Sequence, residues 1–69
     1  MVVMDLIKVL DDMDVVCIRR VFVNEQYKYS NEKTELFKGF SLNIPWSLID
    51  SSVLKINYDT DVLFIDVDD

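Results

Sequence analysis

The sequence predicts a small α+β domain in which short helices cover one face of an antiparallel sheet built from two β-hairpins. Residues 53–58 alternate apolar and polar side chains with the period of a strand, residues 62–67 place Leu63, Ile65 and Val67 on one strand face, and the acidic residues between the two segments favour a turn. Residues 3–13 instead carry apolar side chains at helical spacing. A proline, a tryptophan and a helix-start signal coincide in residues 43–50. We therefore expect the order helix, strand, strand, short helix, strand, strand.

The length and composition indicate one small domain over residues 1–69. The 69 residues are 51% apolar and include one Gly and one Pro, which is typical of a chain that folds. A fold of this size buries only about 60% of its unfolded surface, so its margin of stability is thin. A single cysteine, Cys17, excludes an intrachain disulfide. A second subunit is one way in which such a domain gains stability.

The charge and the apolar runs restrict the partners. A formal net charge of -6 repels nucleic-acid phosphates and anionic lipids, so we expect no direct nucleic-acid binding. No apolar run is longer than residues 15–18, which is far shorter than the roughly 20 residues that span a bilayer. A secretion signal would show a charged region followed by an apolar run, and we find no such pattern in the sequence. We expect a cytoplasmic protein that does not contact membranes.

The first helix is predicted from apolar residues at positions i, i+3, i+4 and i+7, namely Val3, Leu6, Ile7 and Leu10. Asp5 lies in its first turn, where a negative charge meets the positive end of the helix dipole. Asp11 and Asp12 oppose continuation at the other end. Val2 and Val3 are β-branched, so a strand could begin there instead.

The first hairpin is predicted from residues 15–23 and 34–40, which are rich in strand-forming residues. Neither face of residues 15–23 is cleanly polar, which indicates either a strand covered on both sides or a bulge near Arg19 and Arg20. The intervening loop contains Tyr27 and Tyr29. Gly39 allows a bulge or a close backbone approach in the second strand.

The short central helix is predicted over residues 45–50. Pro45 suits the first helical position, and Asn43 can accept a hydrogen bond from an unpaired N–H group. Ile44, Leu48 and Ile49 should turn inward. Trp46 either covers the core or faces outward, and core packing is the first expectation.

The last hairpin should direct Leu63, Ile65 and Val67 toward the core. Its opposite face then exposes Val62 and Phe64 beside Asp66.

The residue types argue against catalysis. The chain has no His, which excludes triads and Cys–His pairs built on imidazole. Cys17 lies among apolar neighbours and is expected to pack in the core rather than to act as a nucleophile. A catalytic carboxylate pair would need a pocket that shifts one pKa, for which so small a chain has little room. The acidic clusters lack the glycine and glutamate of an EF-hand loop, so no metal or other cofactor is expected.

The acidic residues of the last hairpin and the tail permit a sharper hypothesis; they are Asp59, Asp61, Asp66, Asp68 and Asp69. Alternate strand residues lie about 7 Å apart on one side, a spacing that could imitate a row of DNA phosphates. The alternative is a solvated turn and tail. Exposed apolar residues beside the acids favour a contact surface, because interfaces need buried anchors. The predicted partner-binding residues are Tyr27, Tyr29, Asp59, Asp61, Val62, Phe64 and Asp66.

Residues 5–12 (DLIKVLDD) and 44–50 (IPWSLID), together with a hairpin that ends near a glycine and a final strand pair, resemble small proteins of phages and mobile elements of Gram-positive bacteria. The likeness spans most of the chain but depends mainly on the second motif. It implies an accessory gene product, and such small acidic proteins include inhibitors of host defence, among them anti-CRISPR proteins. The long strand over residues 15–23 and the tyrosine loop depart from the usual pattern.

We therefore predict a non-enzymatic protein-binding inhibitor that acts in the bacterial host cytoplasm and blocks a host protein, such as a nuclease that handles nucleic acid. The acidic residues would engage a basic groove, and Phe64 and the tyrosines would anchor the contact. The alternative is a structural or assembly protein, in which the apolar outer face of the last hairpin pairs two copies in a homodimer.

Overall fold

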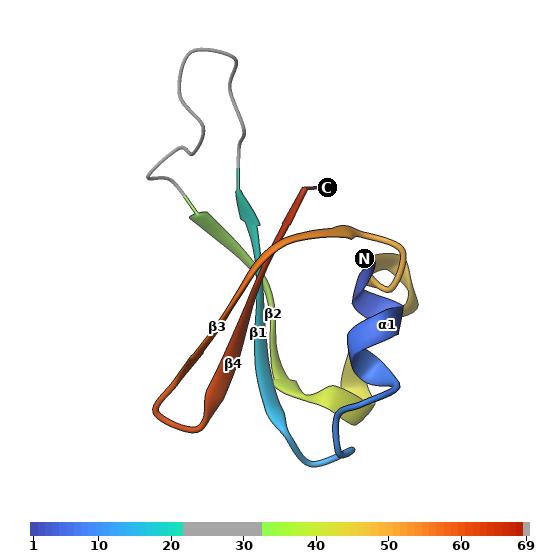
Figure 1. The fold of residues 1–69 in the computed structure, drawn as a ribbon, viewed down its shortest axis with the longest axis vertical. Helices are drawn as coiled ribbons and strands as arrows, with labels where there is room; N and C mark the ends of the chain where they lie inside the picture. Colours follow the sequence, from blue (N-terminus) through green and yellow to red (C-terminus); the bar gives the residue numbers. More distant parts are fainter. Residues whose placement is uncertain (22–32, 69) are drawn as a thin grey trace.

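A computed structural model describes residues 1–21 and 33–68 and confirms a small α+β fold. Helix α1 (Val3–Ile7) precedes strands β1 (Val15–Val21) and β2 (Lys33–Phe40). Two short 3₁₀ helices follow, η1 (Ser41–Asn43) and η2 (Trp46–Leu48), and then strands β3 (Ser52–Asp59) and β4 (Val62–Asp68). Figure 1 shows α1 and the segment that contains η1 and η2 together on one side of the sheet. No helix in the described ranges is long and apolar enough to cross a membrane.

The four strands form one mixed sheet in the order β2-β1-β4-β3. The two hairpins, β1 with β2 and β3 with β4, are antiparallel as predicted. The two central strands, however, pair in parallel, from Val15 opposite Val62 to Arg20 opposite Val67. The expected wholly antiparallel sheet is therefore wrong. Residues 41–51, here called the crossing segment, run back along the sheet beside α1, so the second hairpin enters next to β1 (Figure 1).

Both hairpins contain an irregularity. Ile18 lies opposite Phe37 and Arg19 opposite Glu35, so Leu36 is an extra residue on β2. The sequence left open a bulge near Arg19 and Arg20. The register does shift next to Arg19, but the extra residue lies on β2, and β1 keeps its alternation. Leu36 and Phe37 both pack against the core as a result.

The core lies between the sheet and the layer formed by α1 and the crossing segment. It contains Val3 from α1, Leu48 from η2, and Val16, Ile18, Ile65 and Val67 from the two central strands. The inward positions of Ile65, Val67 and Leu48 agree with the sequence prediction. Gly39 shares this face, where an added Cβ would lie 3.2 Å from the Phe37 ring.

Helix α1 is shorter than the predicted residues 3–13, because backbone groups on both sides bond to the crossing segment. The N–H groups of Val3 and Met4 donate to the carbonyl oxygens of Ser51 (3.1 Å) and Ile49 (2.9 Å). Beyond the helix, the Asp12 carbonyl accepts from the N–H of Leu42 at 3.0 Å. These bonds draw residues 11–14 away from the helix axis.

The predicted helix over residues 45–50 is a single 3₁₀ turn. Pro45 precedes it in extended conformation rather than occupying its first position, and no side chain caps it. Asn43 belongs to η1 and does not act as a cap. Trp46 is 80% exposed, which contradicts the expectation that it packs in the core. Of the three residues expected to turn inward, Leu48 is buried, and Ile44 and Ile49 are half-buried.

The turn between β3 and β4 has left-handed backbone at both central positions. Thr60 has φ 48° and Asp61 has φ 64°, and Asp59 pairs with Val62 on either side. Positive φ at both positions is the geometry of a type I′ turn, which favours Asn or Gly. A β-branched threonine is a poor residue for this conformation.

We predict that Thr60→Asn raises the free energy of unfolding by about 1 kcal/mol, because asparagine tolerates the left-handed conformation better than threonine. Urea unfolding monitored by circular dichroism measures the change. The matched control is Thr34→Asn within β2, where asparagine is a poor strand former and should lower stability. Equal effects of the two substitutions would contradict the assignment of the turn.

Candidate functional site

The sheet has an open face, defined as the face opposite α1 and the crossing segment. Its two central strands present Val15, Cys17 and Arg19 from β1 beside Val62, Phe64 and Asp66 from β4. The strand pairing arranges these residues in rows across the sheet, an apolar row nearest the β3–β4 turn and a charged row farther along. Prediction from sequence alone treated this face as one exposed apolar and acidic surface.

The charged row is an internal network. The Asp66 carboxylate accepts a hydrogen bond from Arg19 Nε at 2.8 Å and another from Lys33 Nζ at 3.1 Å. The Asp66 side chain is only 6% exposed. The Arg19 guanidinium also lies over the Phe64 ring, 4.6 Å from its centroid. Asp66 is thus buried and paired, contrary to its predicted exposure, because two basic side chains converge on it.

Cys17 lies in the same network. Its thiol donates to Glu35 Oε1 at 3.5 Å, and the residue is buried. Burial raises the pKa of the Cys17 thiol, and the hydrogen bond and negative charge of Glu35 raise it further. Arg19 and Lys38 act in the opposite direction. The group therefore stays a neutral thiol at neutral pH, which suits packing rather than nucleophilic attack.

The apolar row lies at the other end of the open face. Val15 is paired with Phe40 on one side and with Val62 on the other. Phe40 is 41% exposed, whereas Val15 and Val62 are half-buried. The row adjoins the β3–β4 turn, because Asp59 pairs with Val62 across the hairpin.

Acidic residues gather around an exposed tyrosine at this end of the molecule. Tyr58 is 67% exposed, and its hydroxyl donates to Asp61 Oδ1 at 3.4 Å. Thr60 Oγ1 donates to Asp59 Oδ1 at 3.0 Å. Asp14 and Asp61 both line a small cavity of about 100 Å³ beside the Tyr58 ring. We call Asp14, Tyr58, Asp59 and Asp61 the acidic end; the β3–β4 turn and the loop before β1 both lie there (Figure 1).

The structure separates the predicted contact residues. Asp59, Asp61 and Val62 come together at the acidic end, whereas Phe64 and Asp66 belong to the charged network. Asp68 pairs with Ser52 at the far end of β4, so the acids do not form one continuous row. Tyr27, Tyr29 and Asp69 lie outside the described residues.

Sequence reasoning missed two members of the acidic end. Tyr58 belongs to the apolar set of residues 53–58, whose alternation does not indicate that its side chain is exposed and lines a cavity with Leu10. Asp14 belongs to an acidic run, and the sequence does not indicate which residues of other elements lie beside it. Within residues 1–21 and 33–68, no group of three or more potential metal-ligating residues is clustered.

We predict that Asp66→Ala lowers the free energy of unfolding by about 1–3 kcal/mol, because Arg19 and Lys33 then lose the carboxylate that both contact. Their partial exposure keeps the loss below that of a fully buried pair. Chemical denaturation measures it. The control is Asp68→Ala on the same strand, exposed, which should change stability by less than about 0.5 kcal/mol. Similar losses for both variants would contradict this account.

The environment of Cys17 gives a second prediction, measurable as the pH midpoint of its ultraviolet thiolate absorbance. Glu35→Gln should lower the pKa of Cys17, because it removes a negative charge that opposes ionisation. Lys38→Gln, the matched control, should raise the pKa. The folded state holds a proton that the unfolded thiol releases, so stability should fall as pH rises above the ordinary thiol pKa. Shifts of the same sign in both variants would contradict the electrostatic assignment.

Comparisons of the chain with protein-family models, with curated proteins and with solved structures gave no significant match.

Proposed function

We propose that this protein acts by binding another protein, without catalysis, and that the acidic end contacts a basic surface of its partner. The observation that carries the proposal is the contrast between two sets of carboxylates. Asp66 is neutralised by Arg19 and Lys33. Asp14, Asp59 and Asp61 form no ion pair with a base among the described residues, and Asp14 and Asp61 line a small cavity together with the exposed Tyr58.

The charged network illustrates the chemistry that the acidic end offers. Arg19 contacts a carboxylate and an aromatic ring together, those of Asp66 and Phe64. Tyr58 and Asp61 provide the same pair of groups at the surface, with a separation of 3.4 Å between the tyrosine hydroxyl and the carboxylate. An arginine of a partner could bond to the carboxylate and stack on the ring, a combination that strengthens when water is excluded.

The class of partner follows from charge and from the sequence resemblance. A net charge of -6 favours a basic surface, and nucleases carry such surfaces where they bind nucleic acid. The resemblance to phage and mobile-element proteins makes a host defence nuclease the first partner to test. In this proposal Asp59 and Asp61 occupy positions that phosphates would otherwise take, and the apolar row provides the adjoining contact.

Homo-oligomerisation is the second candidate, and the apolar row supports it. Phe40 is exposed beside Val15 and Val62 in a continuous strip. Two copies could pair these strips. Sedimentation at micromolar concentration distinguishes the candidates: a dimer that dissociates on Val62→Asp favours assembly, and a monomer argues against it.

We predict that the double substitution Asp59→Lys and Asp61→Lys weakens binding to an inhibited nuclease by at least about tenfold, because it places like charges against a basic groove. The measurement is the affinity for purified nucleases of Gram-positive bacteria, at low and at moderate salt. The wild-type complex should weaken as salt increases.

The control is the double substitution Asp50→Lys and Asp68→Lys, which makes the same change in net charge at two other exposed positions. It should weaken binding much less. Equal losses of affinity in the two double variants would mean that overall charge, and not the acidic end, determines binding. A complex that neither variant affects would overturn the role of the acidic end.

A further inference from the structure

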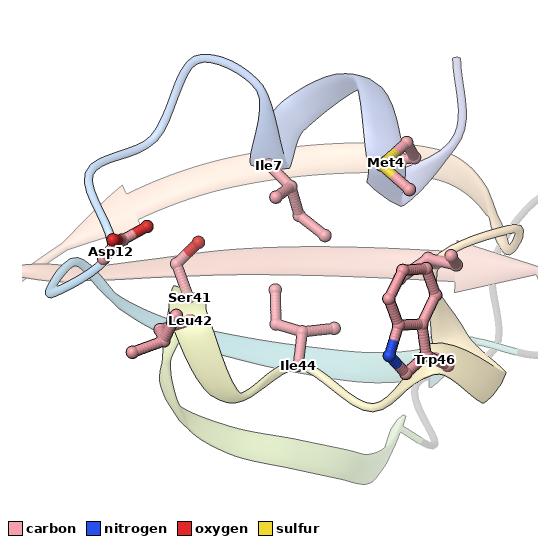
Figure 2. Close-up of a pocket in the computed structure, with 8 residues that line it drawn as sticks. Met4, Ile7, Asp12, Ser41, Leu42, Ile44 and Trp46 are labelled. Carbon is pink, nitrogen blue, oxygen red and sulfur yellow. The ribbon is translucent and has the colours of Figure 1, made fainter.

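A groove separate from the acidic end lies between α1 and the crossing segment. It encloses about 240 Å³, and its lining is mostly apolar: Met4, Ile7, Asp12, Ser41, Leu42, Ile44, Trp46 and Ile49. Figure 2 shows Ile7 pointing from α1 toward Ile44, with Met4 above the Trp46 indole at one end and Asp12 at the other. The groove is therefore an apolar channel with Trp46 at one end and Asp12 at the other.

The exposure of its walls is unusual for residues of this kind. Trp46 is 80% exposed and Leu42 is 65% exposed. The Trp46 indole N–H makes no hydrogen bond within the described part of the chain. Tryptophan is the residue most enriched among the energetic centres of interfaces, and an apolar body with a free polar edge suits it to that role.

The size and shape indicate the side chains of a macromolecule. Pockets for small-molecule ligands usually measure about 300–1,000 Å³ and enclose most of the ligand, whereas this groove is smaller and open along its length. It can accept one or two large aliphatic side chains between Ile7 and Ile44. A segment of chain that continues past them would reach both ends.

Charge determines what kind of segment fits. Among the described residues that line the groove, Asp12 is the only charged one, and Asp11 and Asp50 are exposed next to lining residues in the sequence. A second copy of this chain would bring a further net charge of -6 toward these carboxylates, and such repulsion opposes self-association here. A basic segment meets attraction at the same place.

We propose that the groove binds a short cationic segment of a partner protein, in which large aliphatic residues enter between Ile7 and Ile44 and a lysine or arginine contacts Asp12. The indole of Trp46 covers the other end of the bound segment. This surface does not include the acidic end, so the two sites can be tested independently.

The experiment uses Trp46 as its own reporter, because it is the only tryptophan of the chain. The probe is a capped, labelled peptide with leucines at i, i+3 and i+4 followed by two arginines. Saturable binding should shift the tryptophan emission to shorter wavelength as the indole leaves water, with a Kd on the order of 10–100 μM. A peptide that carries glutamates in place of the arginines should bind at least about tenfold more weakly.

Variants locate the contact by anisotropy of the labelled peptide. Trp46→Ala should weaken binding by about tenfold or more, and Asp12→Asn by about threefold with a smaller dependence on salt. Because Trp46 is largely exposed, its substitution should leave the circular dichroism spectrum and the thermal midpoint close to those of the wild type. Val9→Ala, which removes an exposed apolar side chain outside both the groove and the acidic end, is the control and should bind the peptide normally.

Several outcomes would overturn the proposal. They are an emission spectrum that no concentration of the arginine peptide shifts, equal binding of the glutamate peptide, or equal losses in Trp46→Ala and Val9→Ala. Self-association that Trp46→Ala abolishes would assign the groove to a second copy. Normal peptide binding by the Asp59→Lys, Asp61→Lys double variant would show that the groove works apart from the proposed function.

Discussion

The parallel pairing of β1 with β4 is the constraint on which the rest of the structure depends. Because these strands are central, each is flanked by a hairpin partner and covered on one face by α1 and the crossing segment. Parallel neighbours cannot be joined by a tight turn, so the chain must return along the sheet between β2 and β3. That return path is the crossing segment, which forms one wall of the groove and bonds to both ends of the helical region.

The same pairing divides the acidic residues into two populations. It brings Asp66 beside Arg19, where a buried carboxylate is compensated by two bases and an aromatic ring. Asp59 and Asp61 lie at the hairpin turn, away from those bases, and remain open to solvent. A net negative charge therefore describes the surface poorly, since one acid stabilises the sheet while others are available to a partner.

Local pattern predicted most of the strands because each buries one face. The alternation of Leu63, Ile65 and Val67 placed β4 correctly. The mixed character of residues 15–23 left open a strand covered on both sides or a bulge. In the structure one face of β1 packs in the core, and on the other face Cys17 and Arg19 bond to Glu35 and Asp66. Strand order was not predictable, because alternation identifies an inner face without identifying the neighbouring strand. Pro45 and Asn43 gave a helix-start signal, but backbone bonds to the N-terminal segment favour a 3₁₀ turn that leaves Trp46 outside. Asp66 was misjudged because its bases lie on other strands, 47 residues away in the case of Arg19.

The sequence distance between β1 and β4 also affects how the chain acquires its structure. The two strands that contribute most of the core lie near opposite ends of the chain, so their contacts have high contact order, which slows folding. During synthesis β1 must wait for β4 to leave the ribosome, with its apolar faces covered only in part by β2. Until β4 pairs with β1, the first hairpin is the species most exposed to aggregation or to capture by a chaperone.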